Sequence, residues 1–324
     1  MQKITNKCSK SNVAIDVVKL ILSYMVVAIH TEPFGFSFWL DKGFGIFTRF
    51  CVPFFFVASS YFFFLKKGSP FRYINRLLIL YVVWSLIYLP FDIPTLKTMS
   101  FWQILVKYLW TGNGHALWYL CGSIVGFIIV YLLAKVLSPK KVLVTAVVFL
   151  IIGCLKSTYL PLVSRILPIQ ITDYLGSRNG VFYAFPYYAL GLFIADKNIC
   201  YDKPQKKNIV ALLVCFFLLC VESIVMVWFF KTKATIIWLS VFPLTYNFFV
   251  IVKDLHIPIK DNTGYFLRKC STSIYVSHCL FMYCFPNLLH WKSFLVSAFF
   301  ATIFSVVVTL MGKNKFFRWT KFLS

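Results

Sequence analysis

A histidine lies deep within the first apolar stretch of the chain, which reads DVVKLILSYMVVAIH from residue 16 to residue 30. An imidazole takes up and releases a proton near neutral pH, so His30 is a candidate general base or binding group. Lys19 precedes His30 by 11 residues, a spacing that puts both on one helix face to within about 20°. Asp16 lies one turn before Lys19, where the two side chains can pair. Ionisable groups inside a bilayer are costly, and this makes them candidates for function.

Two further stretches combine apolar and polar residues. NGHALWYL, residues 113–120, has His115 and Trp118 at one end of an apolar run. STSIYVSH, residues 271–278, has Ser273, Tyr275 and His278 close together in the sequence. Interfacial aromatic residues and ordinary core packing would also explain these groups. We treat all five, together with Asp16, Lys19 and Arg76, as candidate substrate-binding residues.

Charged residues and a proline interrupt other apolar runs. FRYINRL has Arg72 and Arg76 at the foot of such a run, where arginine either sets membrane orientation or binds phosphate. Arg49 and Glu222 lie in apolar surroundings, and both would pair with other polar groups there. Pro186 lies inside the apolar run that follows RNG, where proline loosens a helix and often lines a cavity.

The composition requires a lipid environment. The 324 residues are 60% hydrophobic and 13% charged, with a mean hydropathy of +0.79, whereas soluble proteins are about 25% charged. The net charge of +23 is typical of lysine and arginine in cytoplasmic loops, and the apolar composition excludes a soluble nucleic-acid binder. The ten cysteines have no CxxC pair and the five histidines are scattered. We therefore expect mostly buried thiols and no metal site.

The apolar segments predict an all-α, polytopic membrane helix bundle of about ten transmembrane helices, because a span needs about 20 apolar residues. With the N-terminus inside, 22 lysines and arginines lie in or beside inner segments and 9 in or beside outer loops. This asymmetry predicts that both termini are cytoplasmic. We expect a single domain over residues 1–324, in a protein of the cell (plasma) membrane. The first apolar run is expected to remain as a membrane helix rather than be cleaved as a signal peptide. The expected spans are 13–34, 43–65, 77–94, 117–137, 141–160, 180–196, 208–230, 234–252, 271–290 and 292–311.

Four motifs in this order resemble the integral membrane acyltransferase 3 family, over nearly the whole chain. They are the spacing from Lys19 to His30, HALWYL at 115–120, FPYYALG at 185–191 and SIYVSH at 273–278. AIHTEPF, VPFFFVASSYF and RNGVFYAFP also resemble the membrane half of vancomycin-resistance serine racemases, a branch of the same group.

The resemblance implies transfer of an acyl group, usually acetyl, from cytoplasmic acyl-CoA to a hydroxyl of a cell-envelope glycan or a small molecule. His30 would be the catalytic histidine, acting as general base or as a transient acyl carrier, and we favour the general base. Lys19 occupies a position where the family commonly has arginine. Lysine lacks the planar guanidinium fork that binds phosphate through two hydrogen bonds. Arg76 matches a family arginine. The family often has a second arginine closer to this position than Arg72 is to Arg76, so Arg72 departs from the family pattern. The oligomeric state stays open.

Two other classes of function remain open. A membrane transporter of a small solute such as an amino acid would also use His30, Arg49, Glu222 and a proline-broken helix. A non-catalytic membrane scaffold has little use for histidines within the bilayer. Binding of acyl-CoA distinguishes the enzyme from both, because neither alternative requires it.

Overall fold

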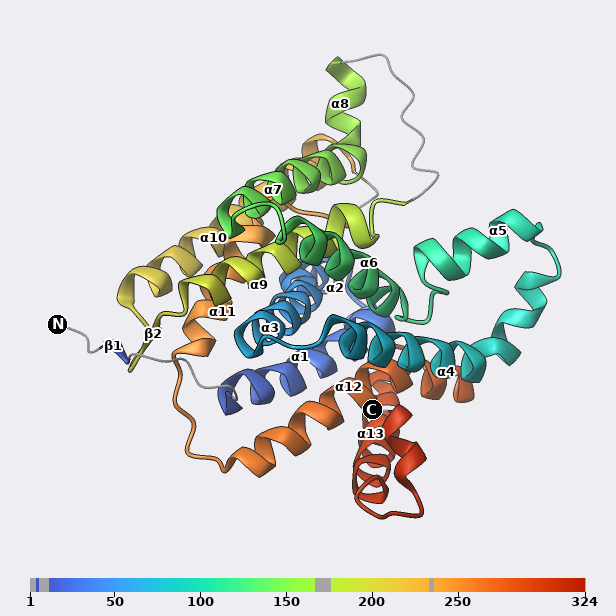
Figure 1. Ribbon diagram of the computed structural model, residues 1–324. Helices are drawn as coiled ribbons and strands as arrows, with labels where there is room; N and C mark the ends of the chain where they lie inside the picture. Colours follow the sequence, from blue (N-terminus) through green and yellow to red (C-terminus); the bar gives the residue numbers. More distant parts are fainter. Residues whose placement is uncertain (1–3, 6–11, 167–175, 233–235, 324) are drawn as a thin grey trace. The chain divides into compact units, whose positions relative to one another are not determined.

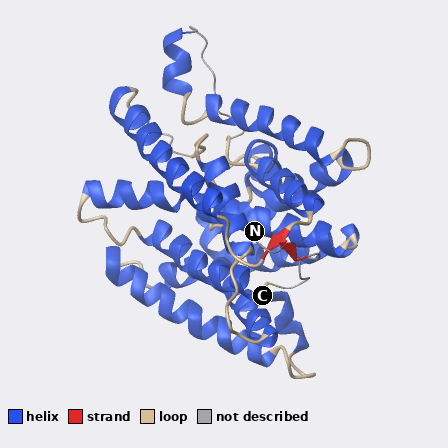
Figure 2. Cartoon of the chain, turned by 90° about the vertical axis from the view of Figure 1, so that its left-hand side faces the viewer, coloured by secondary structure: helices blue, strands red, loops and turns tan. Residues whose placement is uncertain are grey.

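The computed structural model describes residues 4–5, 12–166, 176–232 and 236–323. The described residues are 78% helical, which confirms the all-α class (Figures 1 and 2). In the described parts the strands are limited to an antiparallel pair, β1 (Ile4–Thr5) with β2 (Cys200–Tyr201). The α-helices are α1 (Val13–Thr31), α2 (Phe38–Phe47), α3 (Cys51–Lys66), α4 (Pro70–Leu96), α5 (Phe101–Leu105), α6 (Trp118–Leu133), α7 (Pro139–Lys156), α8 (Leu160–Ile166), α9 (Phe185–Lys197), α10 (Lys206–Ile224), α11 (Val241–Lys253), α12 (Asp261–Cys284) and α13 (His290–Met311).

Shorter helical turns extend or connect these helices. The 3₁₀ turns are η1 (Thr48–Phe50) and η5 (Arg318–Leu323), and the π-helical turns are η2 (Val106–Thr111), η3 (Gly180–Ala184) and η4 (Val225–Phe229). Pro186 is the second residue of α9, directly after η3, and the backbone is helical from one into the other. Pro186 has no N–H to bond a carbonyl of the preceding turn, and the irregular π-helical backbone lies directly before it.

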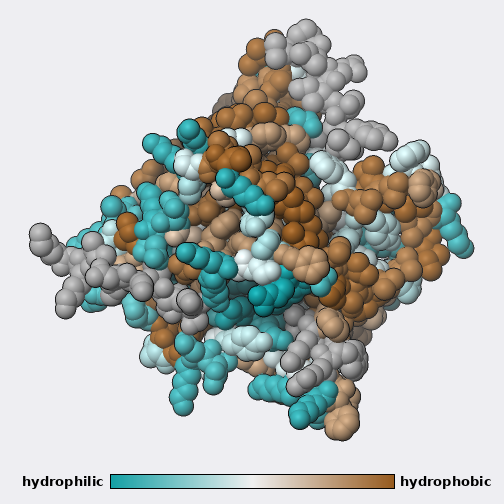
Figure 3. Space-filling model, in the orientation of Figure 1, coloured by the Kyte–Doolittle hydropathy of each residue, from teal (hydrophilic) through white to brown (hydrophobic). Residues whose placement is uncertain are grey.

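Five helical segments are long and apolar enough to cross a membrane, or six if the bent pair α7 and α8 forms one span. This finding concerns the described residues, and the predicted span 234–252 begins outside them. Large apolar side chains such as Val210, Leu213 and Phe217 are exposed along α10. Hydrophobic residues also cover much of the face seen in Figure 3. Together with the family described below, these helices identify a membrane protein, while the ten spans and their orientation stay predictions.

The chain divides into two compact units. Unit 1 is formed by residues 1–10, 53–70 and 121–255, and unit 2 by residues 11–52, 71–120 and 256–324. Every sequence-predicted site residue belongs to unit 2.

Close backbone contacts characterise unit 1. A Cβ at Gly191 of α9 would lie 2.6 Å from the Val57 carbonyl oxygen of α3, so only glycine allows these helices to approach so closely. Ser60 of α3 donates a hydrogen bond of 2.5 Å to the Tyr188 carbonyl of α9. Eight of the described cysteines are free thiols, as expected, but Cys200 is disulfide-bonded, contrary to the expectation of thiols alone.

Glu222 of α10 has a local structural explanation within unit 1. Its carboxylate accepts hydrogen bonds from the Leu239 amide at 2.8 Å and the Ser240 amide at 2.9 Å. The hydroxyls of Ser240 and Tyr159 donate to the same carboxylate. These bonds satisfy amide groups just before α11, so Glu222 holds two segments together.

In unit 2, α1 and α12 lie side by side and run in the same direction (Figure 1). The Ser271 hydroxyl of α12 donates to the Lys19 carbonyl of α1 at 2.9 Å, and further along both helices the rings of His30 and His278 are 5.1 Å apart. Helix α1 begins at an Asn12 cap, whose side chain accepts from the Ile15 amide.

The two other long helices of unit 2 complete this group. Helix α13 runs opposite to α12, and hence to α1, since Cys270 lies 3.9 Å from the Thr309 hydroxyl while Phe285, directly after α12, stacks on Phe300. Helix α4 runs with α12, and its Tyr88 hydroxyl donates to the Val276 carbonyl at 2.7 Å. These directions agree with those expected of the first, third, ninth and tenth predicted spans.

Candidate active site

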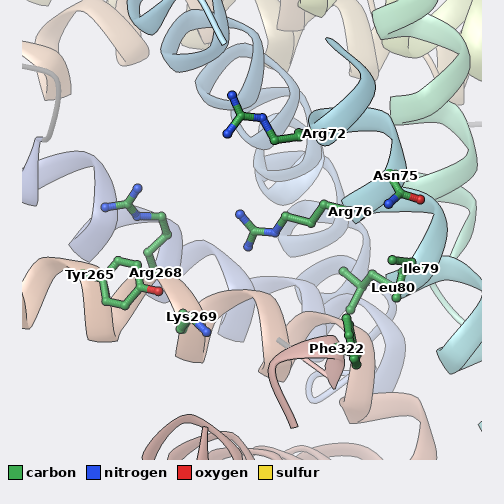
Figure 4. Close-up of a pocket in the computed structure, with 9 residues that line it drawn as sticks. All are labelled: Arg72, Asn75, Arg76, Ile79, Leu80, Tyr265, Arg268, Lys269 and Phe322. Atoms are coloured by element: carbon green, nitrogen blue, oxygen red, sulfur yellow. The ribbon is translucent and has the colours of Figure 1, made fainter. Parts of the chain in front are cut away.

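A basic pocket lies between the first turns of α4 and the first half of α12 (Figure 4). Its volume is about 460 Å³. The guanidinium groups of Arg72 and Arg76 extend from α4 toward the side of α12 where Arg268 lies. Among the described residues that line the pocket, four are basic and none is acidic. The full lining is Arg72, Asn75, Arg76, Ile79, Leu80, Tyr265, Arg268, Lys269 and Phe322.

Asp16 and Lys19 of α1 lie next to the Arg268 side of this pocket. The buried Asp16 carboxylate pairs with the Arg268 guanidinium at 3.1 Å. Lys19 interacts electrostatically with Asp16, Arg268 and Arg76. The sequence predicted an attraction between Asp16 and Lys19, and Arg268 joins it from another helix. Asp16 thus positions Arg268 as well as balancing its charge.

His30 and His278 meet between α1 and α12. Their ring centroids are 5.1 Å apart, with 42° between the ring planes. His278 is fully buried, whereas His30 is partly exposed. The Nδ1 atom of His278 is 2.7 Å from the Tyr275 carbonyl oxygen, which can only accept, so Nδ1 donates and Nε2 has the lone pair. The Sγ atom of Cys279 is 3.3 Å from that Nε2.

Ser273 and Tyr275 belong to the same stretch of α12 and differ in their surroundings. The Ser273 hydroxyl is buried and has no hydrogen-bond partner within the described part of the chain. The Tyr275 hydroxyl donates to the Ala116 carbonyl at 3.1 Å, and its ring is 6.2 Å from that of His278. Tyr275 therefore packs between the histidine pair and the segment before α6. Substrate binding by either residue stays a prediction.

A second polar cluster surrounds Asp92 near the end of α4. The buried Asp92 carboxylate is 2.7 Å from the Lys107 ammonium and 3.0 Å from Nε2 of His115. Nδ1 of His115 is 2.5 Å from the Tyr283 hydroxyl of α12. The Tyr108 hydroxyl donates to Asp92, and burial, together with this carboxylate, raises the pKa of Tyr108 to about 12. The phenol therefore remains protonated at neutral pH.

The predicted site residues are thus distributed along helices that share one direction. Ten residues separate Arg268 from His278 on α12, an axial distance of about 15 Å. Arg76 and Asp92 are 16 residues apart on α4, about 24 Å. The basic pocket, the histidine pair and the Asp92 cluster therefore follow one another along unit 2. Trp118, partly buried as the first residue of α6, follows His115 in the chain.

Comparison with known families identifies the family of the chain. A family described as an acyltransferase domain matches residues 12–312. The chain belongs to this acyltransferase family. The match extends over parts of both units and includes every residue of the candidate site described above except Phe322.

The curated relatives of this acyltransferase domain have another kind of name. An amino-acid racemase of Enterococcus faecalis is 29% identical over 94% of this chain and 46% of the relative, and a second one is 28% identical over 55% of this chain and 28% of the relative. A serine/alanine racemase of Enterococcus gallinarum is 27% identical over 58% of this chain and 30% of the relative. The chain spans about half the length of these relatives, or less. No solved structure matches. The predicted family and branch are both confirmed.

Several residues of the acyltransferase domain site were missed from the sequence. Asp92 is the acidic residue of the predicted third span. A carboxylate within a membrane span costs energy unless it has a partner, so the sequence could have identified Asp92 as a candidate site residue. Arg268 precedes His278 by ten residues, much as Lys19 precedes His30. Cys279 gave no signal, because its proximity to two histidines depends on the packing of α1 against α12.

Proposed function

We propose that the chain is a plasma-membrane acyltransferase that moves an acyl group, in the simplest case acetyl, from cytoplasmic acyl-CoA to a hydroxyl of a cell-envelope glycan or small molecule. The observation that best supports this proposal is the order of the basic pocket and the histidine pair along unit 2. A pocket with three arginines and a lysine comes first, and a histidine pair follows about 15 Å further along the same helices. Both termini would be cytoplasmic, which puts the pocket at the inner surface.

On the donor side, the phosphates of acyl-CoA would bind in the basic pocket. Arginine offers a planar fork to phosphate oxygens, and Arg72, Arg76 and Arg268 face one space, with Lys269 beside them. A volume of about 460 Å³ is that of a ligand pocket. The pantetheine arm has roughly the length of five extended residues, about 17 Å, so it reaches from this pocket to the histidine pair.

The chemistry would use His30 as a general base. Its imidazole takes the proton of the acceptor hydroxyl while that oxygen attacks the thioester carbonyl. The carbon–sulfur bond then breaks, and the CoA thiolate leaves with the proton returned from His30. His278 supports the reaction as a neutral ring, fixed by the Tyr275 carbonyl at 2.7 Å. General-base catalysis typically contributes about 10²–10⁴ in rate.

On the acceptor side, the cluster of Asp92, His115 and Tyr283 would hold the hydroxyl-bearing substrate. It lies at the end of α4 opposite to the basic pocket, and His115 stacks on Tyr88 at 4.7 Å. Trp118 is near in sequence and offers an aromatic face suitable for a sugar. With the termini inside, this end of unit 2 would face the outer surface.

A transporter of an amino acid is the alternative, and the names of the relatives favour it. The E. gallinarum protein is named a serine/alanine racemase, and serine is also a small molecule with a hydroxyl group. The hydrogen bonds of Glu222 to the Leu239 and Ser240 amides argue against its use in a solute path, because the carboxylate is already engaged. Acyl-CoA binding separates the two functions.

The decisive experiment measures acetyl-CoA binding and acyl transfer by the purified protein in detergent. His30→Ala should still insert and bind acetyl-CoA, since His30 is distant from the pocket, but acyl transfer should fall by about 10²–10⁴. His256→Ala, at an exposed position outside the site, is the matched control. A folded His30→Ala protein with full transfer activity would refute the assignment of His30. Failure of the wild-type protein to bind acetyl-CoA would refute the enzyme and leave the transporter and the scaffold.

A further inference from the structure

The sequence places five histidines far apart, but the fold assembles two of them with a cysteine. Potential ligand atoms of His30, His278 and Cys279 all lie within 4.8 Å of one another. Residues 30 and 278 meet because α1 and α12 pack in the same direction. The expectation of no metal site was based on the distance between the histidines in the sequence, and the fold brings two of them together.

His278 has the orientation expected of a metal-binding histidine. Its Nδ1 donates to the carbonyls of Tyr275 and Ile274, at 2.7 and 3.3 Å, so the lone pair is on Nε2. Such a hydrogen bond from the second ring nitrogen to a carbonyl is the usual support of a metal-binding histidine. Nε2 is also the atom that faces Cys279 Sγ, at 3.3 Å. The His278 Nε2 and Cys279 Sγ atoms, from adjacent positions of α12, are therefore close enough to bind the same ion.

The chemistry of the donors selects the type of ion. Two imidazoles and a thiolate bind zinc and other borderline or soft divalent ions, whereas magnesium and calcium require oxygen ligands, which this trio lacks. Three protein ligands leave the fourth tetrahedral position for water or another molecule. Binding needs the thiolate, so the Cys279 thiol releases its proton to solvent as the metal–sulfur bond forms.

We propose that His30, His278 and Cys279 bind a zinc-type divalent cation and that the bound ion blocks acyl transfer by occupying the His30 nitrogen. The blocking role rests on the proposed function, in which His30 accepts the proton of the acceptor hydroxyl, since one lone pair cannot both bind the ion and accept that proton. Binding of the ion is independent of the proposed function. Zinc is then a reversible inhibitor, removed by chelation.

Cobalt provides a test that does not require catalysis. The chelator-treated protein in detergent is titrated with Co²⁺, and a thiolate ligand gives a sulfur-to-cobalt charge-transfer absorption band. We expect one equivalent to bind the wild-type protein with this band. Cys279→Ala should lose the band and bind at least about 10-fold more weakly, corresponding to about 1.4 kcal/mol. Cys284→Ala, which removes an exposed thiol of the same helix, is the matched control and should behave as the wild type.

The outcomes separate the two proposals. No band in the wild-type protein, or a band that persists in Cys279→Ala, overturns the metal site whatever the acyl-transfer assay gives. If the ion binds through Cys279 but zinc leaves acetyl transfer unchanged, the blocking role is overturned. We expect zinc to lower transfer in the wild type and Cys284→Ala, and to do so less in Cys279→Ala, each relative to its own zinc-free rate. A protein that binds cobalt but never acetyl-CoA refutes the enzyme and leaves the metal site standing.

Discussion

Arg268 is expected to contribute to both stability and donor binding, and Arg268→Gln tests both. Its guanidinium lines the basic pocket and also pairs with the buried carboxylate of Asp16 at 3.1 Å. Arg76 lines the same pocket from α4. Arg76→Gln is therefore the matched variant that removes a cation from the pocket and leaves the ion pair with Asp16 in place.

The size of the stability effect follows from the geometry. Two unit charges 3.1 Å apart attract by about 5 kcal/mol at an effective dielectric constant of 20. The Arg268 side chain is 30% exposed, so solvent screens a large part of this attraction. Lys19 also continues to act on Asp16 after the substitution. We expect a net loss of about 1–2 kcal/mol, which lowers the melting temperature by roughly 1.5–3 °C in a chain of this size.

The assay is thermal unfolding in detergent of the wild type, Arg268→Gln, Asp16→Asn and the double variant. The double variant should be less destabilised than the sum of the single variants, because the asparagine needs no counter-ion. Its affinity for acetyl-CoA should nevertheless stay low, by about 10-fold or more, since a charge-assisted bond is worth about 1.5–3 kcal/mol. Arg268→Gln as stable as Arg76→Gln, with no coupling in the cycle, would refute the stabilising role of the ion pair.

Composition predicted the class of fold, and a local motif singled out His30 as the candidate catalytic residue, a role that stays a prediction. Neither predicted what surrounds His30. Apolar runs identify helices because lipid contact leaves few alternatives to them. The partners His278 and Cys279 lie about 250 residues away in the chain, and their approach depends on the packing of α1 against α12. His278 was singled out by its own motif, whereas its distance from His30 was not predictable.

Helix boundaries show a related limit. The predicted ninth span covers residues 271–290, whereas α12 covers Asp261–Cys284. Hydropathy reports where lipid-compatible residues lie, and the polar first turns of α12 fail that criterion while remaining helical. Those turns place Gly264 against Val13 and Arg268 against Asp16. Arg72 and Arg76 were candidates from the sequence, whereas the contribution of α12 to the basic pocket was located only by the structure.

Two further substitutions test the far end of unit 2 and the close packing of unit 1. Asp92→Asn removes the anion that binds Lys107 and His115, so we expect a higher KM for the acceptor and unchanged acetyl-CoA affinity, because the pocket is about 24 Å away along α4. Weaker acetyl-CoA binding with an unchanged acceptor KM would contradict the assignment of the two ends. Gly191→Ala would put a Cβ 2.6 Å from the Val57 carbonyl oxygen, and relief requires movement of the α9 backbone. The expected loss is about 1–3 kcal/mol of unfolding free energy, measured by thermal unfolding against wild type. An unchanged melting temperature would mean that α3 and α9 do not pack this closely, because a rigid backbone carbonyl cannot move aside as a flexible side chain would.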